Sequence, residues 1–270
     1  MLPWRSQLLH KKTQKSAFLL VCLRSLSTLT NLEQNSTPSV AALNIAIISG
    51  STRKQGPPLP ILGNRVNKHF KSILSERGHK VFIIDPNNHD EGMNLPLLEK
   101  PHFAYSKSQV PEEMENIHNK LKNADCYVAI TPEYNHAPSP GLLNILNHFG
   151  SSTFSFKPSA IVSYSAGQWG GTRAAHSLRP VLSELGCLPV SAMVHIPNAA
   201  DVLDEEGKFK ISGTLQNSKE DKELKWTNYV LRCVSQLEWW ADAAKEQRTR
   251  IDPTIKSPPL AKNPKERNAL

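Results

Sequence analysis

The chain has 270 residues, of which 39% are hydrophobic and 21% are charged. A chain of this length and composition can bury a core, which excludes a wholly disordered protein. Its longest fully apolar run, residues 17–23, is too short to span a bilayer, so we expect no membrane insertion.

The net charge of +8 is concentrated in the two ends of the chain. Residues 1–40 hold five basic residues and one acidic residue, and residues 245–270 hold seven basic and three acidic residues. The remaining body carries 20 basic and 20 acidic residues and is neutral. A nucleic-acid-binding surface needs cations clustered on a folded face, so we expect no nucleic-acid partner.

The composition of the two ends divides the chain into three predicted segments: an extension, a folded domain and a tail. Residues 1–40, which are basic and rich in serine with no acid before Glu33, are typical of a transit peptide or a disordered extension. Residues 246–270 combine prolines with charges and read as a disordered basic tail. The folded domain is then residues 41–245, and the expected compartment is cytoplasmic or mitochondrial.

Cysteine spacing indicates no metal site. The four cysteines lie far apart without a C-x-x-C pair, so they predict neither a zinc site nor a disulfide framework. They are Cys22, Cys126, Cys187 and Cys233. Reduced thiols in a reducing compartment are the simplest reading.

Short apolar strands alternate with amphipathic helices along the body. The predicted strands are residues 43–49, 80–85, 126–131, 159–164 and 189–195. The predicted helices are residues 63–76, 111–123, a helix opened by Pro140, 171–185 and about 219–245. This alternation predicts an α/β fold with a parallel sheet and helices on both faces. Ligands of such sheets collect beyond the carboxyl ends of the strands.

The loop after the first strand, residues 50–53, has the composition of a phosphate site. A glycine, two hydroxyls and Arg53 precede a helix, although a plain polar loop has the same composition. Neither common phosphate fingerprint is present, because no lysine follows Gly56 and Thr52 stands where a second glycine is needed.

The loops after the third and fourth strands offer a ring-binding surface. Tyr134 and Asn135 could face a flat polar ring, or Tyr134 could simply cover the sheet edge. The glycines of residues 165–171 let backbone N–H groups approach a ligand closely. The same stretch is one residue away from the nucleophile elbow G-x-S-x-G, so a serine hydrolase using Ser165 with Glu184 and His195 stays open.

Four segments together resemble the NADPH-dependent FMN reductase family, which includes flavodoxin-like quinone and azo-dye reductases. They are GSTR (50–53), LPLLEKP (95–101), TPEYNH (131–136) and SYSAGQWGG (163–171). The resemblance implies a flavodoxin-like three-layer sandwich with a five-stranded parallel sheet in the order 2-1-3-4-5. It also implies non-covalent FMN and a homodimer or homotetramer.

The resemblance also assigns the flavin site. Ser51 and Arg53 would hold the phosphate, with Asn64 as a further ligand. The ring would lie between the two later loops, lined by Pro132, Glu133, Tyr134 and Asn135 on one side and by Ser165, Gly167, Gly170 and Gly171 on the other. NADPH or NADH would deliver a hydride to the flavin, and a quinone or similar small molecule would take two electrons. No side chain then needs to act as a nucleophile or metal ligand.

Two features depart from the family pattern. A proline-rich stretch, residues 55–60, lengthens the segment after Arg53 and puts the later phosphate contacts in doubt. The following family helix usually reads L-K-N-A-I-D, whereas residues 142–147 lack its lysine and aspartate, which removes any interface ion pair. A flavodoxin-type electron carrier without NAD(P)H activity is the second alternative, although its partner face would be acidic.

Overall fold

Strand β1 (Asn44–Ser49) is flanked in parallel by β2 (Lys80–Ile84) and β3 (Cys126–Tyr134). This computed structural model describes residues 41–59, 61–87, 95–210 and 219–253. Beyond β3 lies β5 (Pro158–Tyr164), which pairs in parallel with both β6 (Leu188–Pro189) and β7 (Val194–Ile196). A short strand, β4 (Ala137–Pro138), turns back antiparallel onto β3.

The expected strand order is confirmed, but the expected number of strands is wrong. Within the described ranges the sheet has seven strands, in the order β2-β1-β3-β5-β6 with β4 and β7 off this path. The predicted fifth strand, residues 189–195, is divided because side chains bond to its backbone. Arg179 Nη2 donates to Val190 O at 2.8 Å, and Ala192 N donates to Gln236 Oε1 at 2.9 Å.

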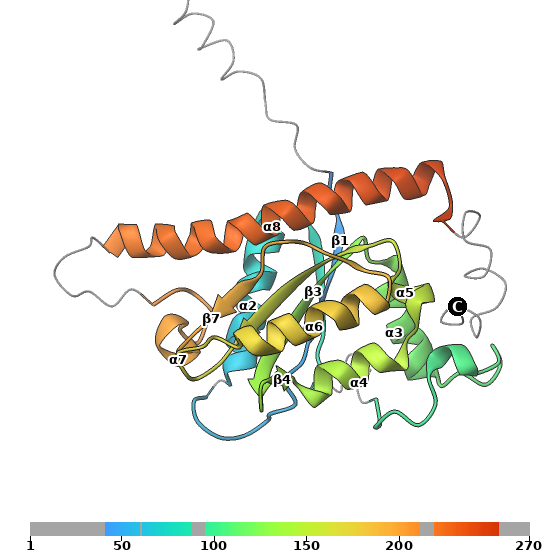
Figure 1. The fold of residues 1–270 in the computed structure, drawn as a ribbon, viewed down its shortest axis with the longest axis horizontal. Coiled ribbons are helices and arrows are strands. Elements are labelled where there is room, and N and C mark those ends of the chain that lie inside the picture. Colours follow the sequence, from blue (N-terminus) through green and yellow to red (C-terminus); the bar gives the residue numbers. More distant parts are fainter. Residues whose placement is uncertain (1–40, 60, 88–94, 211–218, 254–270) are drawn as a thin grey trace, which may run out of the picture. The chain divides into compact units, whose positions relative to one another are not determined.

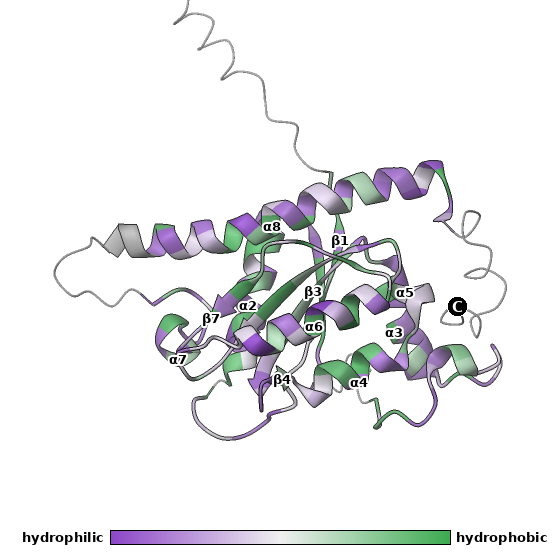
Figure 2. Cartoon of the chain, viewed as in Figure 1, coloured by the Kyte–Doolittle hydropathy of each residue, from purple (hydrophilic) through white to green (hydrophobic). Residues whose placement is uncertain are grey.

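Helices cover both faces of the sheet and form three layers (Figure 1). One face contacts α2 (Leu62–Glu76) and α8 (Lys219–Arg250), and the other contacts α3 (Glu112–Asn123), α4 (Pro140–His148) and α6 (Thr172–Glu184). Alternate residues of β1 enter the two cores, with Ile45 and Ile47 on the α2 face and Ile48 on the other. Figure 2 shows hydrophobic residues, in green, along these central strands, and many hydrophilic residues, in purple, along α8.

Short helical turns complete the described part: η1 (His102–Ala104), α5 (Ser151–Phe154) and α7 (Ala199–Val202). Pro140 does open α4, and the Ser139 hydroxyl accepts a hydrogen bond from Leu142 N at its N-terminus. No helix of the described ranges is long and apolar enough to cross a membrane.

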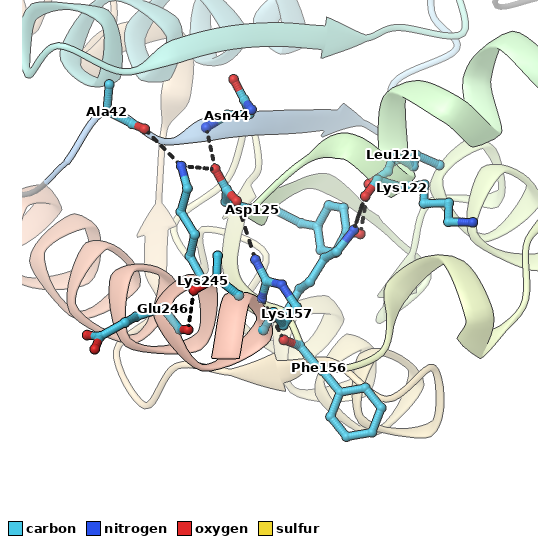
Figure 3. A network of polar contacts seen from close by, with 12 residues as sticks. Ala42, Asn44, Leu121, Lys122, Asp125, Phe156, Lys157, Lys245 and Glu246 are labelled. Atoms are coloured by element: carbon cyan, nitrogen blue, oxygen red, sulfur yellow. Dashed lines mark hydrogen bonds and ion pairs between the residues drawn. The ribbon is translucent and has the colours of Figure 1, made fainter. Parts of the chain in front are cut away.

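Asp125, just before β3, joins α8 to the amino end of the sheet (Figure 3). Its carboxylate accepts from Asn44 N and from Lys245 Nζ, both at 2.9 Å, and from Arg248 Nη2 at 3.3 Å. Because Arg248 binds Asp125, α8 continues to Arg250, five residues past the expected domain end at 245. The boundaries of the domain and of the two ends stay predictions, and residues 1–40 and 254–270 lie outside the described residues.

Candidate functional site

A cavity of 160 Å³ opens at the carboxyl ends of β1, β3 and β5, where ligands of parallel sheets collect. Three of the loops singled out in the sequence meet there. The lining residues are Ser51, Arg53, Ile61, Leu62, Gly63, Pro132, Glu133, Tyr134, Tyr164, Ser165 and Ala166. Six expected site residues thus lie together: Ser51, Arg53, Pro132, Glu133, Tyr134 and Ser165.

The loop after β1 is held firmly against the rest of the site. Gly50 N donates to Ile130 O at 2.8 Å, and the Ser139 hydroxyl donates to Gly50 O at 2.7 Å. Ser51 belongs to this loop and is buried against the first turn of α2. A Cβ atom on Gly63 would lie 2.8 Å from Ser51 Cβ and from Tyr164 Oη, so only glycine lets these groups approach the helix terminus.

Tyr164 is a lining residue that the sequence analysis missed. Burial raises the pKa of its phenol, so the hydroxyl remains protonated and can donate a hydrogen bond into the cavity. Period-2 alternation along β5, with Val162 in the same core cluster, is the signal that could have placed it on the α2 face.

Arg53 bends back over its own loop. Its Nη2 lies 3.4 Å from the carbonyl oxygens of Gln55 and Pro57, within the proline-rich stretch. Arg53 lines the cavity and also a neighbouring cleft beside α2. Asn64 lines that cleft rather than the cavity.

The TPEYNH segment forms a strand end and a tight hairpin rather than an open loop. Pro132 to Tyr134 belong to β3, and Pro132 is in register with Tyr164 of β5. Asn135 and His136 both have positive φ, 51° and 64°, and connect β3 to β4 as a two-residue turn. Asn135 is exposed at this turn and does not line the cavity.

The Glu133 carboxylate points toward the start of α6. It accepts from Arg173 Nε at 2.9 Å and from the backbone N–H groups of Arg173 and Ala174 at 3.2 and 3.3 Å. Burial raises the pKa of Glu133, but the hydrogen bonds from Arg173 and Ala174 outweigh it and hold the pKa below its usual value. Glu133 therefore stays ionised and is engaged in capping the helix.

The glycine loop after β5 is hydrogen-bonded to the segment that follows β7. Asn198 N donates to Gly167 O at 2.9 Å, and the Ser165 hydroxyl donates to the same oxygen at 2.8 Å. Gly171 has φ 75°, and a Cβ there would lie 2.9 Å from Ser163 Cβ. Gly167, Gly170 and Gly171 thus shape the loop around Ser165 without lining the cavity themselves.

The geometry disfavours the serine hydrolase. His195 lies in β7, and its Nδ1 contacts the hydroxyl of Ser163, not Ser165, at 2.8 Å. Because the Ser163 hydroxyl also contacts Gly170 O at 2.8 Å as a donor, it accepts from His195. A nucleophile needs a base within hydrogen-bond reach, and the Ser165 hydroxyl instead donates to Gly167 O.

The cavity's chemistry fits FMN. Ser51, Arg53 and the N-terminus of α2 are a donor set for a phosphate. The end of β3 lines one side of the cavity, and Ser165 and Ala166 line the other, so that a flat ring could lie between them. In the described ranges no three or more His, Cys, Asp or Glu side chains group as metal ligands, and Cys126, Cys187 and Cys233 are buried free thiols.

The family model for NADPH-dependent FMN reductase matches residues 43–201. The chain belongs to this family. A quinone reductase of Pseudomonas putida is 30% identical over 172 residues, which cover 62% of this chain and 84% of that protein. A probable NADPH:quinone oxidoreductase of Oryza sativa is 28% identical over 186 residues, 68% of this chain and 87% of that protein.

A solved structure shares the fold. The flavoenzyme FerB, an NAD(P)H:(acceptor) oxidoreductase of Paracoccus denitrificans, superposes with a TM-score of 0.50 at 20% identity and covers 75% of this chain and 95% of its own. The expected flavodoxin-like α/β fold is confirmed, as is the expected family.

Proposed function

We propose that this protein is an FMN-dependent NAD(P)H oxidoreductase that passes two electrons to a quinone or a similar small acceptor. Family membership and the relatives named quinone reductases support this function. The single observation that carries it is the meeting of a phosphate-type donor set, Ser51 and Arg53, with the backbone of Pro132–Tyr134 in one cavity.

The protein's own part is binding and electrostatics. Ser51, Arg53 and the first turn of α2 would hold the FMN phosphate, and the chain around Pro132, Tyr134 and Ser165 would hold its ring. Bound FMN supplies the two-electron hydride chemistry. Tyr164 keeps a neutral hydroxyl beside Ser51, and Glu133 keeps a fixed negative charge on Arg173, so neither group exchanges a proton near neutral pH.

The experiment is a visible spectrum of the full chain after incubation with FMN and desalting, followed by anaerobic NADPH. We expect a retained flavin band that NADPH bleaches and that a quinone restores. A retained band that neither NADPH nor NADH bleaches would favour the electron carrier. A chain that retains no flavin would contradict the proposal, and hydrolysis of a simple ester that is lost in Ser165→Ala would favour the hydrolase.

We further propose a homodimer or homotetramer. Two large apolar side chains are exposed, Leu97 at 82% and Trp169 at 61%, and such side chains favour burial against a partner. Asn144 fixes the loop that carries Leu97, because it accepts from Leu98 N at 3.0 Å and donates to Pro96 O at 2.9 Å. Light scattering on the eluting protein tests this, and a monomer at micromolar concentration would contradict it.

The compartment is proposed as cytoplasmic or mitochondrial from the composition of residues 1–40. Fusing these residues to a fluorescent protein tests the choice. Mitochondrial fluorescence with a shortened product would select mitochondria, diffuse fluorescence at full length would select the cytoplasm, and secretion would contradict both.

A further inference from the structure

A second, larger cleft of 660 Å³ lies between α2 and the carboxyl end of β2. It is lined by Arg53, Lys54, Leu59, Ile61, Asn64, Asn67, Lys68, Lys71, Ile83, Asp85 and Asn87. Arg53 and Ile61 also line the flavin cavity, so the two hollows are adjacent. The proposed flavin site does not account for this cleft.

The cleft carries an excess of positive charge. Four basic side chains and one carboxylate, that of Asp85, line it. Lys68 and Lys71 are exposed and lie three residues apart on α2, and Lys68 Nζ donates a hydrogen bond to Glu205 O at 2.9 Å. In a chain whose body is otherwise neutral, this local concentration of cations favours a phosphate-bearing ligand.

Two asparagines that line the cleft have an amide oxygen without a hydrogen-bond partner. Asn67 is 4% exposed, and its Nδ2 donates to Ser49 Oγ at 3.0 Å, while its Oδ1 has no partner. Asn87 donates from Nδ2 to Ser51 O at 2.6 Å, and its buried Oδ1 also has no partner. An unpaired buried acceptor is unfavourable, so a hydroxyl or amino donor of a ligand that reached either oxygen would be stabilised by it.

Apolar side chains complete the wall of the cleft. Leu59, Ile61 and Ile83 can contact a flat base while the lysines contact a phosphate and the asparagines contact hydroxyl or amino groups. A phosphate, a set of donors and a flat base on one ligand are the features of a nucleotide.

We propose that this cleft binds the adenosine end of NADPH, with Lys68 and Lys71 on its 2′-phosphate and the Asn67 and Asn87 side-chain oxygens on adenosine donors. The inference rests on the proposed function, because only a pyridine-nucleotide enzyme would use such a ligand. It deepens that function by assigning the residues that select NADPH over NADH.

The test is calorimetric titration of the FMN-treated full chain with adenosine 2′,5′-bisphosphate and with adenosine 5′-monophosphate. We expect the bisphosphate to bind roughly 10-fold tighter, and to weaken as salt is added. Lys71→Gln and Lys68→Gln should each weaken the bisphosphate by about 5-fold and leave the monophosphate within about 2-fold. Lys80→Gln is the matched control, because Lys80 is an exposed lysine at the other end of β2.

Steady-state kinetics give a second reading. Lys71→Gln should raise the KM for NADPH by about 5-fold without changing kcat or the KM for NADH. Equal affinity for the two adenosine nucleotides, binding of neither, or an unchanged bisphosphate affinity in both lysine variants would overturn the assignment. Because flavin retention is read separately from the absorption spectrum, a chain that holds FMN but shows no bisphosphate preference overturns only the cleft, and a chain without FMN overturns the proposed function.

Discussion

The Nε2–H group of His79 donates to Oε1 of Glu238 at 2.8 Å. The same ring accepts the Leu43 N–H on Nδ1 at 3.3 Å, which fixes the proton on Nε2. Arg77 also pairs with the Glu238 carboxylate, whose side chain is 4% exposed. One buried carboxylate therefore joins α8 to the turn between α2 and β2 and to the start of β1.

Glu238→Gln should lower the free energy of unfolding by about 1–3 kcal/mol, because Arg77 and His79 lose a buried anionic acceptor. Urea unfolding measures the change. Glu246→Gln is the control, because Glu246 is an exposed carboxylate on the same helix, and it should change stability by less than about 0.5 kcal/mol. Equal stability of the two variants would contradict this role.

The stabilisation by Glu238 should also depend on pH. Burial raises its pKa, but hydrogen bonds from Arg77 and His79 outweigh burial and leave the pKa lowered. The contribution is thus complete above the unfolded pKa of about 4.3 and is lost as the pH falls through the lower folded pKa. Unfolding measured from pH 7 to pH 3 should show wild type and Glu238→Gln converging at the acid end.

His118 should make the fold sensitive to mild acid. Burial and the nearby His102, which stacks on it at 3.9 Å between ring centroids, lower the pKa of His118 to about 4. Between the unfolded pKa of about 6.5 and this value, the unfolded chain binds a proton that the folded chain does not, so stability falls as the pH falls.

Comparison with His118→Asn isolates this effect. From pH 7 to pH 4.5 the wild type should lose about 1–3 kcal/mol more than the variant. Urea unfolding at the two pH values measures the difference, and His176→Asn, on α6, is a histidine control expected to behave like wild type. Parallel losses in wild type and His118→Asn would contradict the prediction.

The interaction of Glu133 with Arg173 should contribute to the free energy of unfolding more than to the affinity for flavin. A double-mutant cycle with Glu133→Gln and Arg173→Gln should give a coupling free energy of roughly 0.5–2 kcal/mol, because each partner caps or pairs through the other. Since the Glu133 carboxylate bonds α6, Glu133→Gln should change the FMN dissociation constant by less than about 3-fold. A larger loss of FMN would mean that the carboxylate itself contacts the flavin.

Arg53 should contribute to flavin affinity through its charge and its planar fork of donors. Arg53→Gln should weaken FMN binding by roughly 10-fold, and Arg53→Lys by less, because lysine keeps the charge but cannot donate from a fork. Quenching of flavin fluorescence measures the dissociation constants. Arg232→Gln, an exposed arginine on α8, is the control, and a normal FMN affinity in Arg53→Gln would remove Arg53 from the phosphate site.

The sequence predicted the fold well where periodicity is strong. Ile45, Ile47 and Ile48 mark a strand buried on both faces, and the helical spacing of Val66 and Phe70 marks α2. It missed β4, which has only two residues and exists because Asn135 and His136 turn the chain sharply. It also missed the end of α8, since Arg248 is ordered by Asp125, a partner 123 residues away.

The candidate site was predictable at the level of loops but not of side chains. Polar residues and glycines at the ends of the strands indicate that a ligand binds at this edge of the sheet. Ser51, Arg53 and Ser165 do line one cavity there. No local pattern reveals that Glu133 turns toward α6 or that Asn64 and Asn67 border a different cleft, because both depend on where α2 and α6 lie against the sheet.

The contact of Lys245 Nζ with Ala42 O, at 3.1 Å, brings the first strand and the last helix of the domain together at the amino end of the sheet. The two ends of the folded domain therefore lie close to each other. A circularly permuted chain, in which a short linker joins the end of α8 to the start of β1, should keep every strand pairing and the ligand edge at the opposite end.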